Sequence, residues 1–322
     1  MLPEPLDEAS RLPWEGHSVI ESVPDTFPGV SIVVPIYNAG RFLERTLRSL
    51  LFNDPKGNEI IVMDGGSTDN TGVILEHYKD HFKVCISDKD DGQSDAINKG
   101  FSLATKPILY WLNGDDLILP NALGRVRKVF DQIESVDVLV GNAYLTELDL
   151  TPIRHFEFTP QNLRFECLSD YAVNHLVQPS VFFTRAAWDE CGPLSNELHY
   201  AMDADLFLGM SRKFEFIHLA ADLAYSVYHE GCKTRNKRAE SISELGLVQA
   251  KHGAFAEAHR TLNLVVEMYN SAAGQLQERR DGHSTTSSEC DRCALLSRKV
   301  EAIEQEVERN KDLLLSKDLE TP

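Results

Sequence analysis

Four short apolar runs, each followed by a polar turn, dominate the first part of this chain. The runs are Val30–Ile36, Ile60–Met63, Val84–Ser87 and Ile108–Leu112. They are rich in β-branched and aromatic residues, which is typical of buried strands. The segments between them carry apolar residues at helical spacing, such as Leu43, Leu47, Leu50 and Leu51. A strict alternation of strand and helix predicts an α/β fold with a mostly parallel central sheet and helices on its faces.

The fourth run ends in Asn113-Gly114-Asp115-Asp116, which places two carboxylates side by side. The carboxyl ends of parallel strands meet at one edge of a sheet, and ligands bind there. Two neighbouring carboxylates repel each other unless a bound cation offsets their charge. Such a cation can at the same time bind a second anion. Mg²⁺ or Mn²⁺ bridged to phosphate is the usual cation of this kind. The alternative is a solvated turn in which one aspartate caps the following helix.

Neither common phosphate-binding loop is present in the sequence. No G-x-G-x-x-G follows the first strand, and G-x-x-x-x-G-K-[ST] is absent from the chain. A diphosphate bound at this edge would therefore be held by a metal ion or by side chains.

The next part of the chain continues the alternation with less regularity. We expect a helix over residues 121–134, a strand at Val136–Val140, and further strands and a loop over 144–165. A core strand should follow at Gln178–Phe183, and then a helix with Leu206, Phe207 and Met210 facing inward. The last elements expected here are strands at Phe214–Leu219 and Ala224–Tyr228 and a basic loop at His229–Arg235.

The two ends of the chain have a different composition. Residues 1–29 are rich in proline and acidic residues and are expected on the surface or partly disordered. Residues 236–270 are helical, with one face formed by Phe255, Ala258, Leu262, Val265 and Tyr269, and residues 271–293 form a Gly/Ser/Thr-rich linker. Cys290 and Cys293 make a single C-x-x-C without the two further ligands that zinc needs. The tail, 294–322, has a heptad pattern from Leu296 to Leu314 that fits a short coiled coil or a solvated helix.

The composition excludes several classes of protein. The 322 residues have a formal charge of −18 and a pI near 5.0, which argues against electrostatic binding of nucleic acid. No apolar run approaches the roughly 20 residues of a membrane span, and the acidic N-terminus lacks the layout of a signal peptide. Six scattered cysteines fit reduced thiols. We therefore expect a cytoplasmic protein, with the inner face of the membrane as a second location.

Four segments together resemble glycosyltransferase family 2, the inverting enzymes with a GT-A fold that include bacterial polysaccharide-type transferases. They are SIVVPIYNAGRFLERTLRSL, IIVMDGGSTDNT, DKDDGQSDAINKGFSLATKPILYWLNGDD and HEGCKTR. The resemblance covers residues 30–235. It implies metal-dependent transfer of a sugar from a nucleotide-diphospho-sugar, most often a UDP-sugar, to a hydroxyl of a glycan, a lipid-linked sugar or a protein. The cofactor would be Mn²⁺ or Mg²⁺.

The resemblance also implies roles for individual residues. Pro35, Tyr37 and Asp64 would line the nucleotide base, Gly92 and Asp95 would lie beside the nucleotide or sugar, Asp115 would hold ribose or sugar, and Lys233 and Arg235 would close over the diphosphate. Many relatives have arginine where this chain has Ile97, so one contact to base or phosphate is not implied here.

The metal and the proton transfer are assigned in the same way. Asp116, with Asp115 and His229, would bind the metal, and Asp203 would be the general base. The family has Glu-Asp where this chain has Met202-Asp203, and Ser where it has Cys232. Asp205 lies two residues after Asp203 and so faces a different direction on a helix.

Two other functions remain open from the sequence. A non-catalytic sugar-nucleotide-binding protein is favoured slightly by Met202 and Ile97. A nucleotidyltransferase would use the same sheet edge but usually needs a basic phosphate-clamping segment near the first strand, and VVPIYNAG lacks one. The C-terminal helices are expected to pack on the main domain or to mediate homo-oligomers.

Overall fold

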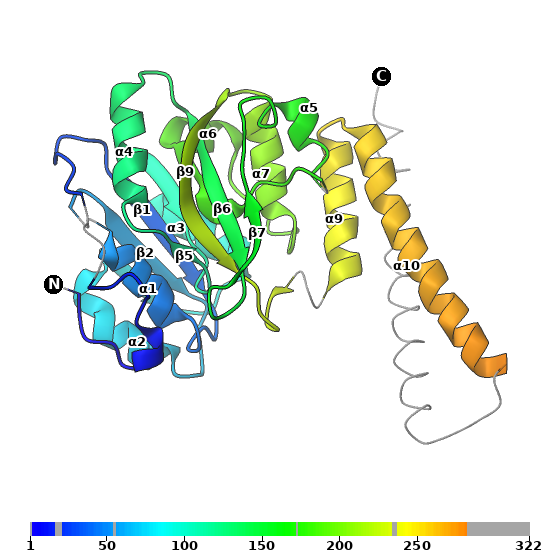
Figure 1. Cartoon of the computed structure of the whole chain (residues 1–322), viewed down its shortest axis with the longest axis horizontal. Coiled ribbons are helices and arrows are strands. Elements are labelled where there is room, and N and C mark those ends of the chain that lie inside the picture. Colours follow the sequence, from blue (N-terminus) through cyan, green and yellow to red (C-terminus); the bar gives the residue numbers. More distant parts are fainter. Residues whose placement is uncertain (1, 17–20, 54–55, 172, 234–236, 282–322) are drawn as a thin grey trace. The chain divides into compact units, whose positions relative to one another are not determined.

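The computed structural model describes residues 2–16, 21–53, 56–171, 173–233 and 237–281, with the side chains of 272–281 excepted. The chain divides into two compact units (Figure 1). Among the residues described, apart from the gaps just given, the first unit contains 2–168 and 173–229, and the second contains 169–171, 230–233 and 237–281.

A nine-stranded sheet forms the centre of the first unit, with the strand order β3-β2-β1-β4-β8-β6-β9-β5 and β7 beside β6. The strands are β1 (Val30–Ile36), β2 (Glu59–Asp64), β3 (Val84–Ser87), β4 (Ile108–Trp111), β5 (Leu117–Ile118), β6 (Val138–Thr146), β7 (Pro152–Phe156), β8 (Val181–Thr184) and β9 (Phe216–Val227).

The predicted mostly parallel sheet is confirmed. Strands β1 to β4 run parallel to one another, and β6 runs parallel to β9. The strands β5, β7 and β8 are antiparallel to their neighbours. The carboxyl ends of β1, β2 and β4 therefore meet at one edge, as the strand–helix alternation requires.

Helices cover the faces of this sheet (Figure 1). They are α1 (Leu43–Phe52), α2 (Thr71–Tyr78), α3 (Gln93–Leu103), α4 (Ala122–Gln132), α5 (Phe165–Leu168), α6 (Arg185–Cys191) and α7 (Met202–Ser211), with short 3-10 turns at Glu8–Ser10, Lys79–His81 and Gln178–Ser180. The predicted inner face of α1 is confirmed, because Leu43 and Leu47 are fully buried. Ile97 and Phe101 of α3 are fully buried as well.

Two expectations about the strands were wrong, and one strand was not predicted. Gln178–Ser180 forms a 3-10 turn, so the strand expected over Gln178–Phe183 begins only at Val181. The two strands expected at Phe214–Leu219 and Ala224–Tyr228 are one long strand, β9. Register shifts against β6 around Asn142 let β9 bend without ending. The short strand β5, directly after Asp116, was not predicted.

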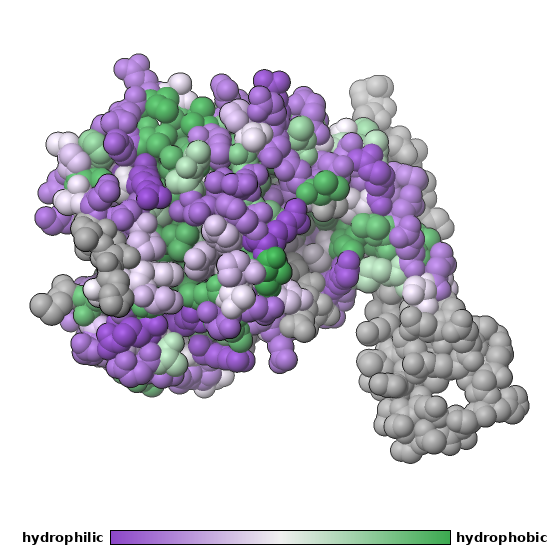
Figure 2. Space-filling view, viewed as in Figure 1, coloured by the Kyte–Doolittle hydropathy of each residue, from purple (hydrophilic) through white to green (hydrophobic). Residues whose placement is uncertain are grey.

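The main core lies between the sheet and its helices. Tyr110 stacks on Phe182 with ring centroids 4.1 Å apart, and Trp111 stacks on Phe207 at 5.8 Å. On the face shown in Figure 2, apolar side chains occur in separate groups among hydrophilic ones. Most large apolar side chains are thus inside, where they fix the strands that carry the site.

The N-terminal extension is packed more firmly than expected. Leu12 is 2 % exposed and belongs to an apolar cluster with Leu117, Leu150 and Val227. Glu15 forms an ion pair with Arg48 of α1. The described part of the extension before residue 17 is therefore an ordered part of the first unit.

The second unit contains α9 (Arg238–Lys251) and α10 (Phe255–Asp281), joined by a turn with Gly253 at φ 75°. A Cβ on Gly246 would lie 2.6 Å from Leu262 Cγ, so the two helices approach closely. Ala258 and Val265 are buried as predicted, whereas Phe255 is 71 % exposed at the start of α10. No helix in the described ranges is long and apolar enough to cross a membrane.

Helix α10 continues to Asp281, so the first part of the segment expected to be a linker is helical. Cys290, Cys293 and the heptad pattern from Leu296 lie outside the described residues. The expected coiled coil and the expected oligomer remain predictions.

Candidate active site

Three polar turns meet at the carboxyl edge of β1, β2 and β4. Ile36, the last residue of β1, pairs with Asp64, the last residue of β2. On the other side, a Cβ on Gly114 would lie 2.6 Å from Ile36 Cγ2, so only glycine lets the turn after β4 approach this closely. Asp64 and the Asn113–Asp116 turn therefore flank the end of the same strand.

Asp64 is 3 % exposed and is held by two serines. Its Oδ1 accepts hydrogen bonds from the amide and hydroxyl of Ser67, at 3.1 and 2.5 Å, and its Oδ2 accepts one from the Ser87 hydroxyl at 2.5 Å. The carboxylate is thus fixed in direction at the strand end.

The turn after β1 is bound to the turn after β2. Asn38 N donates to Ser67 Oγ at 2.7 Å, and Gly40 N donates to Asp69 Oδ2 at 3.0 Å. These bonds leave Tyr37 66 % exposed at the edge, where its ring is accessible to a ligand. Pro35 lies inside β1 opposite Met63 and is buried, so its access to a ligand is limited.

The turn before α3 brings Gly92 and Asp95 to the same region. Gly92 has φ 110°, a conformation that favours glycine, and its Cβ position faces open space. Asp95 accepts a bond from Asp91 N at 3.1 Å and pairs with Lys99 at 2.5 Å, and the Lys99 bond lowers the pKa of Asp95. Gln93, next to Gly92, donates to Asn113 Oδ1 at 2.8 Å, which ties this turn to the turn after β4.

Asp115 and His229 converge although they are far apart in sequence. His229 Nε2 lies 2.9 Å from Asp115 Oδ2. The imidazole side chain is 5 % exposed and stacks on Phe42 with ring centroids 4.2 Å apart, whereas the Asp115 side chain is 34 % exposed. A carboxylate that reaches solvent thus faces an imidazole that is fixed in place.

Asp116 is more buried, at 5 % exposed, and its oxygens already have protein partners. Oδ1 accepts from Val227 N at 3.0 Å and Oδ2 from Asn113 Nδ2 at 3.2 Å. Burial, and secondly the charge of Asp115, raise the pKa of Asp116 well above its usual value. Both carboxylate oxygens of Asp116 thus accept hydrogen bonds from the protein, and its expected role as a metal ligand stays a prediction.

Helix α1 holds the backbone around Asp116 through a set of polar residues that the sequence reasoning missed. Thr46 donates to Asp116 O at 2.9 Å, Ser49 Oγ accepts from Ile118 N at 3.1 Å, and Asn53 donates to Leu119 O at 3.1 Å. Their spacing of three and four residues was the available signal, since it places all three on one helical face.

Asp203 lies in the first turn of α7, four residues before Phe207, which stacks on Trp111 at the end of β4. Its carboxylate accepts a bond from Ala204 N at 2.7 Å. The side chain is half-buried, and loss of hydration raises the pKa of Asp203 to about 6. Met202 is buried, and its thioether side chain has no carboxylate that could orient Asp203.

The predicted phosphate-contacting residues are less defined. Lys233 is exposed and belongs to the second unit. Arg235 lies outside the described residues. Their expected role remains a prediction.

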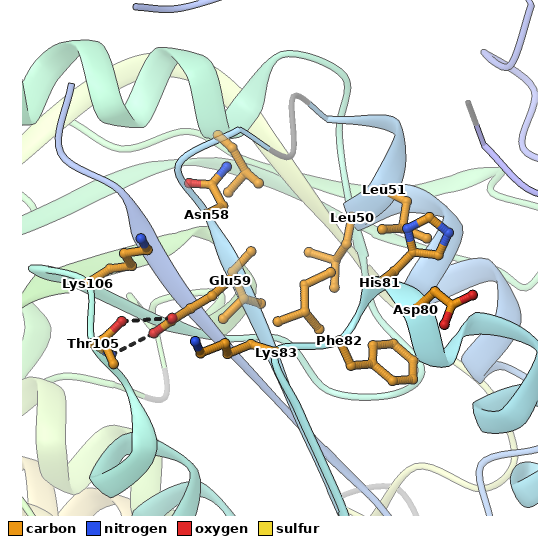
Figure 3. A pocket seen from close by; sticks show the side chains of 13 residues that line it. Leu50, Leu51, Asn58, Glu59, Asp80, His81, Phe82, Lys83, Thr105 and Lys106 are labelled. Atoms are coloured by element: carbon orange, nitrogen blue, oxygen red, sulfur yellow. Dashed lines mark hydrogen bonds between the residues drawn. The ribbon is translucent and has the colours of Figure 1, made fainter. Parts of the chain in front are cut away.

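A hollow of about 340 Å³ lies at the other end of these strands, beside their amino-terminal residues (Figure 3). It is bordered by Glu59, the first residue of β2, and by Thr105 and Lys106, just before β4. Thr105 donates to Glu59 from its amide and hydroxyl, at 2.6 and 2.8 Å. Ligands of such sheets bind at the carboxyl ends of the strands, so we place the candidate site at Asp64, Asp115 and His229.

Comparison with known proteins gives a consistent family relationship. The profile described as Glycosyl transferase family 2 matches residues 31–190. The chain is 33 % identical over 118 residues to an uncharacterized glycosyltransferase of Rickettsia typhi, covering 36 % of each chain. It is 28 % identical over 242 residues to the hyaluronan synthase of Pasteurella multocida, covering 73 % of this chain and 23 % of that one. The match thus spans about a quarter to a third of the length of these relatives.

Two solved structures share the fold. TarS residues 1–349 of S. aureus, in complex with UDP, superimposes with a TM-score of 0.55 at 19 % identity, covering 73 % of this chain and 69 % of that chain. The mannosyltransferase PcManGT of Pyrobaculum calidifontis, in complex with GDP-Man and Mn²⁺, gives 0.56 at 15 % identity, covering 92 % and 89 %.

Proposed function

Because the chain belongs to glycosyltransferase family 2 through the domain at residues 31–190, we propose that it transfers a sugar from a nucleotide-diphospho-sugar to a hydroxyl acceptor, with inversion at the anomeric carbon. The observation that carries this proposal is the Asp115–His229 pair at the carboxyl edge of the parallel strands. The acceptor is a growing glycan, a lipid-linked sugar or a protein side chain.

The residues of this pair fit a divalent cation. Carboxylate oxygen and imidazole nitrogen are both ligands that suit Mn²⁺, and the two atoms already lie within 2.9 Å of each other. Asp115 and His229 would hold the ion, and Asp116 would fix the turn through its bonds to Val227 and Asn113. A bound Mn²⁺ or Mg²⁺ supplies Lewis-acid stabilisation of the charge that grows on the departing diphosphate.

The nucleotide is assigned to the neighbouring turns. Tyr37 offers an exposed ring for stacking on the base. Asp64 can accept a base N–H, because each carboxylate oxygen has more than one acceptor direction. Asp95 and Gly92 would lie beside the ribose or sugar. A UDP-sugar is the favoured donor, and a GDP-sugar is the alternative because PcManGT was solved with GDP-Man.

Asp203 is assigned the proton transfer. The acceptor hydroxyl loses its proton as it attacks, and a positioned carboxylate takes that proton as a general base. Half-burial raises the pKa of Asp203 to about 6, which makes the carboxylate a stronger base than an exposed aspartate while leaving it ionised at neutral pH. A single attack from the face opposite the leaving group inverts the anomeric configuration.

Calorimetry and a donor assay test the proposal. UDP and GDP are titrated into the full chain with Mn²⁺ and with EDTA, and a panel of nucleotide sugars is screened for hydrolysis, with the anomer identified by NMR. We expect metal-dependent binding of one nucleotide and release of the inverted sugar. Tight binding without turnover of any donor would instead support the non-catalytic nucleotide-binding alternative.

The choice of Asp203 is tested with a matched pair of variants. Asp203→Asn should keep nucleotide binding and abolish transfer. Asp205→Asn removes the same charge two residues away, on a different side of α7, and should keep both. Retained transfer in Asp203→Asn would show that a different residue is the base.

A further inference from the structure

The N-terminal segment Pro3–Glu15, which we call the N-terminal strap, contacts the three elements that hold Asp116. These are α1, β5 and β9. The strap reaches β5 and β9 through apolar side chains and α1 through charged ones. Both contacts are separate from the residues proposed to touch substrate.

The apolar contact is made by Leu12. It is 2 % exposed and packs in one cluster with Leu117 and Val227, while Trp14 contacts Tyr225 at 6.1 Å between ring centroids. Leu117 directly follows Asp116, and the amide of Val227 donates to Asp116 Oδ1 at 3.0 Å. Leu12 therefore shares one apolar cluster with the residue that follows Asp116 and with the residue whose amide binds the Asp116 carboxylate.

The charged contact is made on α1. Glu44 accepts from Leu6 N and Asp7 N, at 2.6 and 3.1 Å. Arg48 donates to Pro3 O at 2.7 Å and to Glu15 Oε1 at 2.9 Å, and its side chain is 1 % exposed. A buried charge of this kind is tolerated only while its partners stay in place.

These two residues of α1 lie on either side of Thr46 in the sequence. Residues four apart share one helical face, so Glu44 and Arg48 face the strap together, and Thr46 points to the other side. There it donates to Asp116 O at 2.9 Å. The strap and the Asp116 turn are thus attached to opposite sides of the same helical turn.

We propose that the N-terminal strap is a positioning element for the Asp115–Asp116 turn, with Leu12 as its main positioning residue. By covering Leu117 and Val227 and by fixing α1, it keeps the β5–β9 pair closed beneath the turn. Loss of the strap contact hydrates this pair and widens the distribution of Asp115 positions. The consequence for ligand binding depends on the proposed function, whereas the consequence for β9 does not.

The test uses the full chain with Leu12→Ala and, as a matched control, Leu6→Ala. Leu6 belongs to the same strap but its side chain is 48 % exposed and outside the Leu12 cluster. Amide hydrogen exchange is measured over residues 222–229, and binding of UDP with Mn²⁺ is measured by calorimetry. For Leu12→Ala we expect about tenfold faster exchange in this segment and about tenfold weaker binding. Leu6→Ala should change neither.

Each result decides the question. Unchanged exchange over 222–229 in Leu12→Ala, or faster exchange with unchanged UDP–Mn²⁺ affinity, overturns the proposal. If the wild-type chain binds neither UDP nor GDP in the presence of Mn²⁺, the proposed function fails and the exchange result alone decides the role of the strap. Should Leu12→Ala not fold, Leu12→Val removes one methylene and is tested in its place, with smaller changes in the same direction expected.

Discussion

His229 Nε2 and Asp115 Oδ2 lie 2.9 Å apart although 114 residues separate them in the chain. The turn after β4 supplies the carboxylate, and the end of β9 leads into the histidine. The parallel pairing of β6 with β9 and the antiparallel pairing of β9 with β5 bring the two together. The pair is thus built by long-range sheet contacts at the carboxyl edge of the parallel strands.

The first prediction concerns this pair. Asp115→Asn and His229→Gln should each weaken metal-dependent binding of UDP by about 100-fold, since each removes one proposed ligand and leaves the other without its partner. Calorimetry at fixed Mn²⁺ measures the loss. Asp131→Asn, which removes an exposed carboxylate on α4, is the charge-matched control and should bind normally. Wild-type affinity in both site variants would show that the ion, if one binds, is held elsewhere.

The second prediction concerns the pH dependence of transfer. Half-burial raises the pKa of Asp203 from its usual value near 4 to about 6. A general base acts in its ionised form, so kcat/KM should rise as the pH increases through about 6 and level off above it. In Asp205→Asn the same rise should persist. A flat profile from pH 5 to 8 in the wild-type protein would mean that a different group takes the proton.

Sequence reasoning located the strands and the acidic turns because their signals are local. Val30–Ile36 is one β-branched run, and the strand observed has the same bounds. Asp64 follows such a run directly, and Gly92 and Asp115 lie in the turns after two others, so parallel topology alone places them at one edge. The helical face of α1 that packs on the sheet was equally clear, because leucines repeat at helical spacing.

The remaining features depend on contacts between distant segments, which a single sequence does not encode locally. The burial of Asp116 comes from Val227, far along the chain, whose amide occupies one of its oxygens. The two strands expected at Phe214–Leu219 and Ala224–Tyr228 are the single strand β9, because pairing with β6 continues through two register shifts. The burial of Leu12 depends on Leu117, Leu150 and Val227, and nothing in the acidic N-terminal sequence indicates that cluster.

The third prediction compares two glycine substitutions. Gly246→Ala should lower the free energy of unfolding by about 1–3 kcal/mol, because the new Cβ would overpack the contact between α9 and α10. That Cβ would lie 2.6 Å from Leu262 Cγ. At Gly72 in α2 a Cβ meets nothing within 4 Å. Gly72→Ala should therefore raise the free energy of unfolding by about 0.5 kcal/mol, through the smaller freedom of the unfolded chain.

Urea denaturation followed by circular dichroism measures both glycine variants. Opposite signs for the two substitutions are the expected result. If Gly246→Ala is as stable as the wild-type chain, the contact between α9 and α10 accommodates the extra methyl group without a loss of stability, contrary to the overpacking expected.

The fourth prediction concerns the stability of the metal-free protein. Burial and the charge of Asp115 raise the pKa of Asp116 above the value it has in the unfolded chain, so the folded state holds this proton more tightly. As the pH rises above about 4, the carboxyl group of Asp116 loses its proton in the unfolded chain but keeps it in the folded chain. The free energy of unfolding that Asp116 contributes therefore falls with increasing pH, until the pH exceeds the pKa of Asp116 in the folded chain. Asp116→Asn has no such proton. In EDTA, the free energy of unfolding of the variant relative to the wild type should therefore increase with pH from 4 to 7.

The same variant separates the two roles considered for Asp116. If Asp116 mainly fixes the turn through Val227 and Asn113, Asp116→Asn should weaken binding of UDP with Mn²⁺ less than Asp115→Asn does, because an asparagine oxygen can still accept the Val227 amide. If Asp116 is itself a ligand of the ion, the two variants should lose affinity to the same extent. Calorimetry on both proteins, at one Mn²⁺ concentration and at pH 7, makes this comparison directly, and equal losses would return Asp116 to the role that the sequence first suggested.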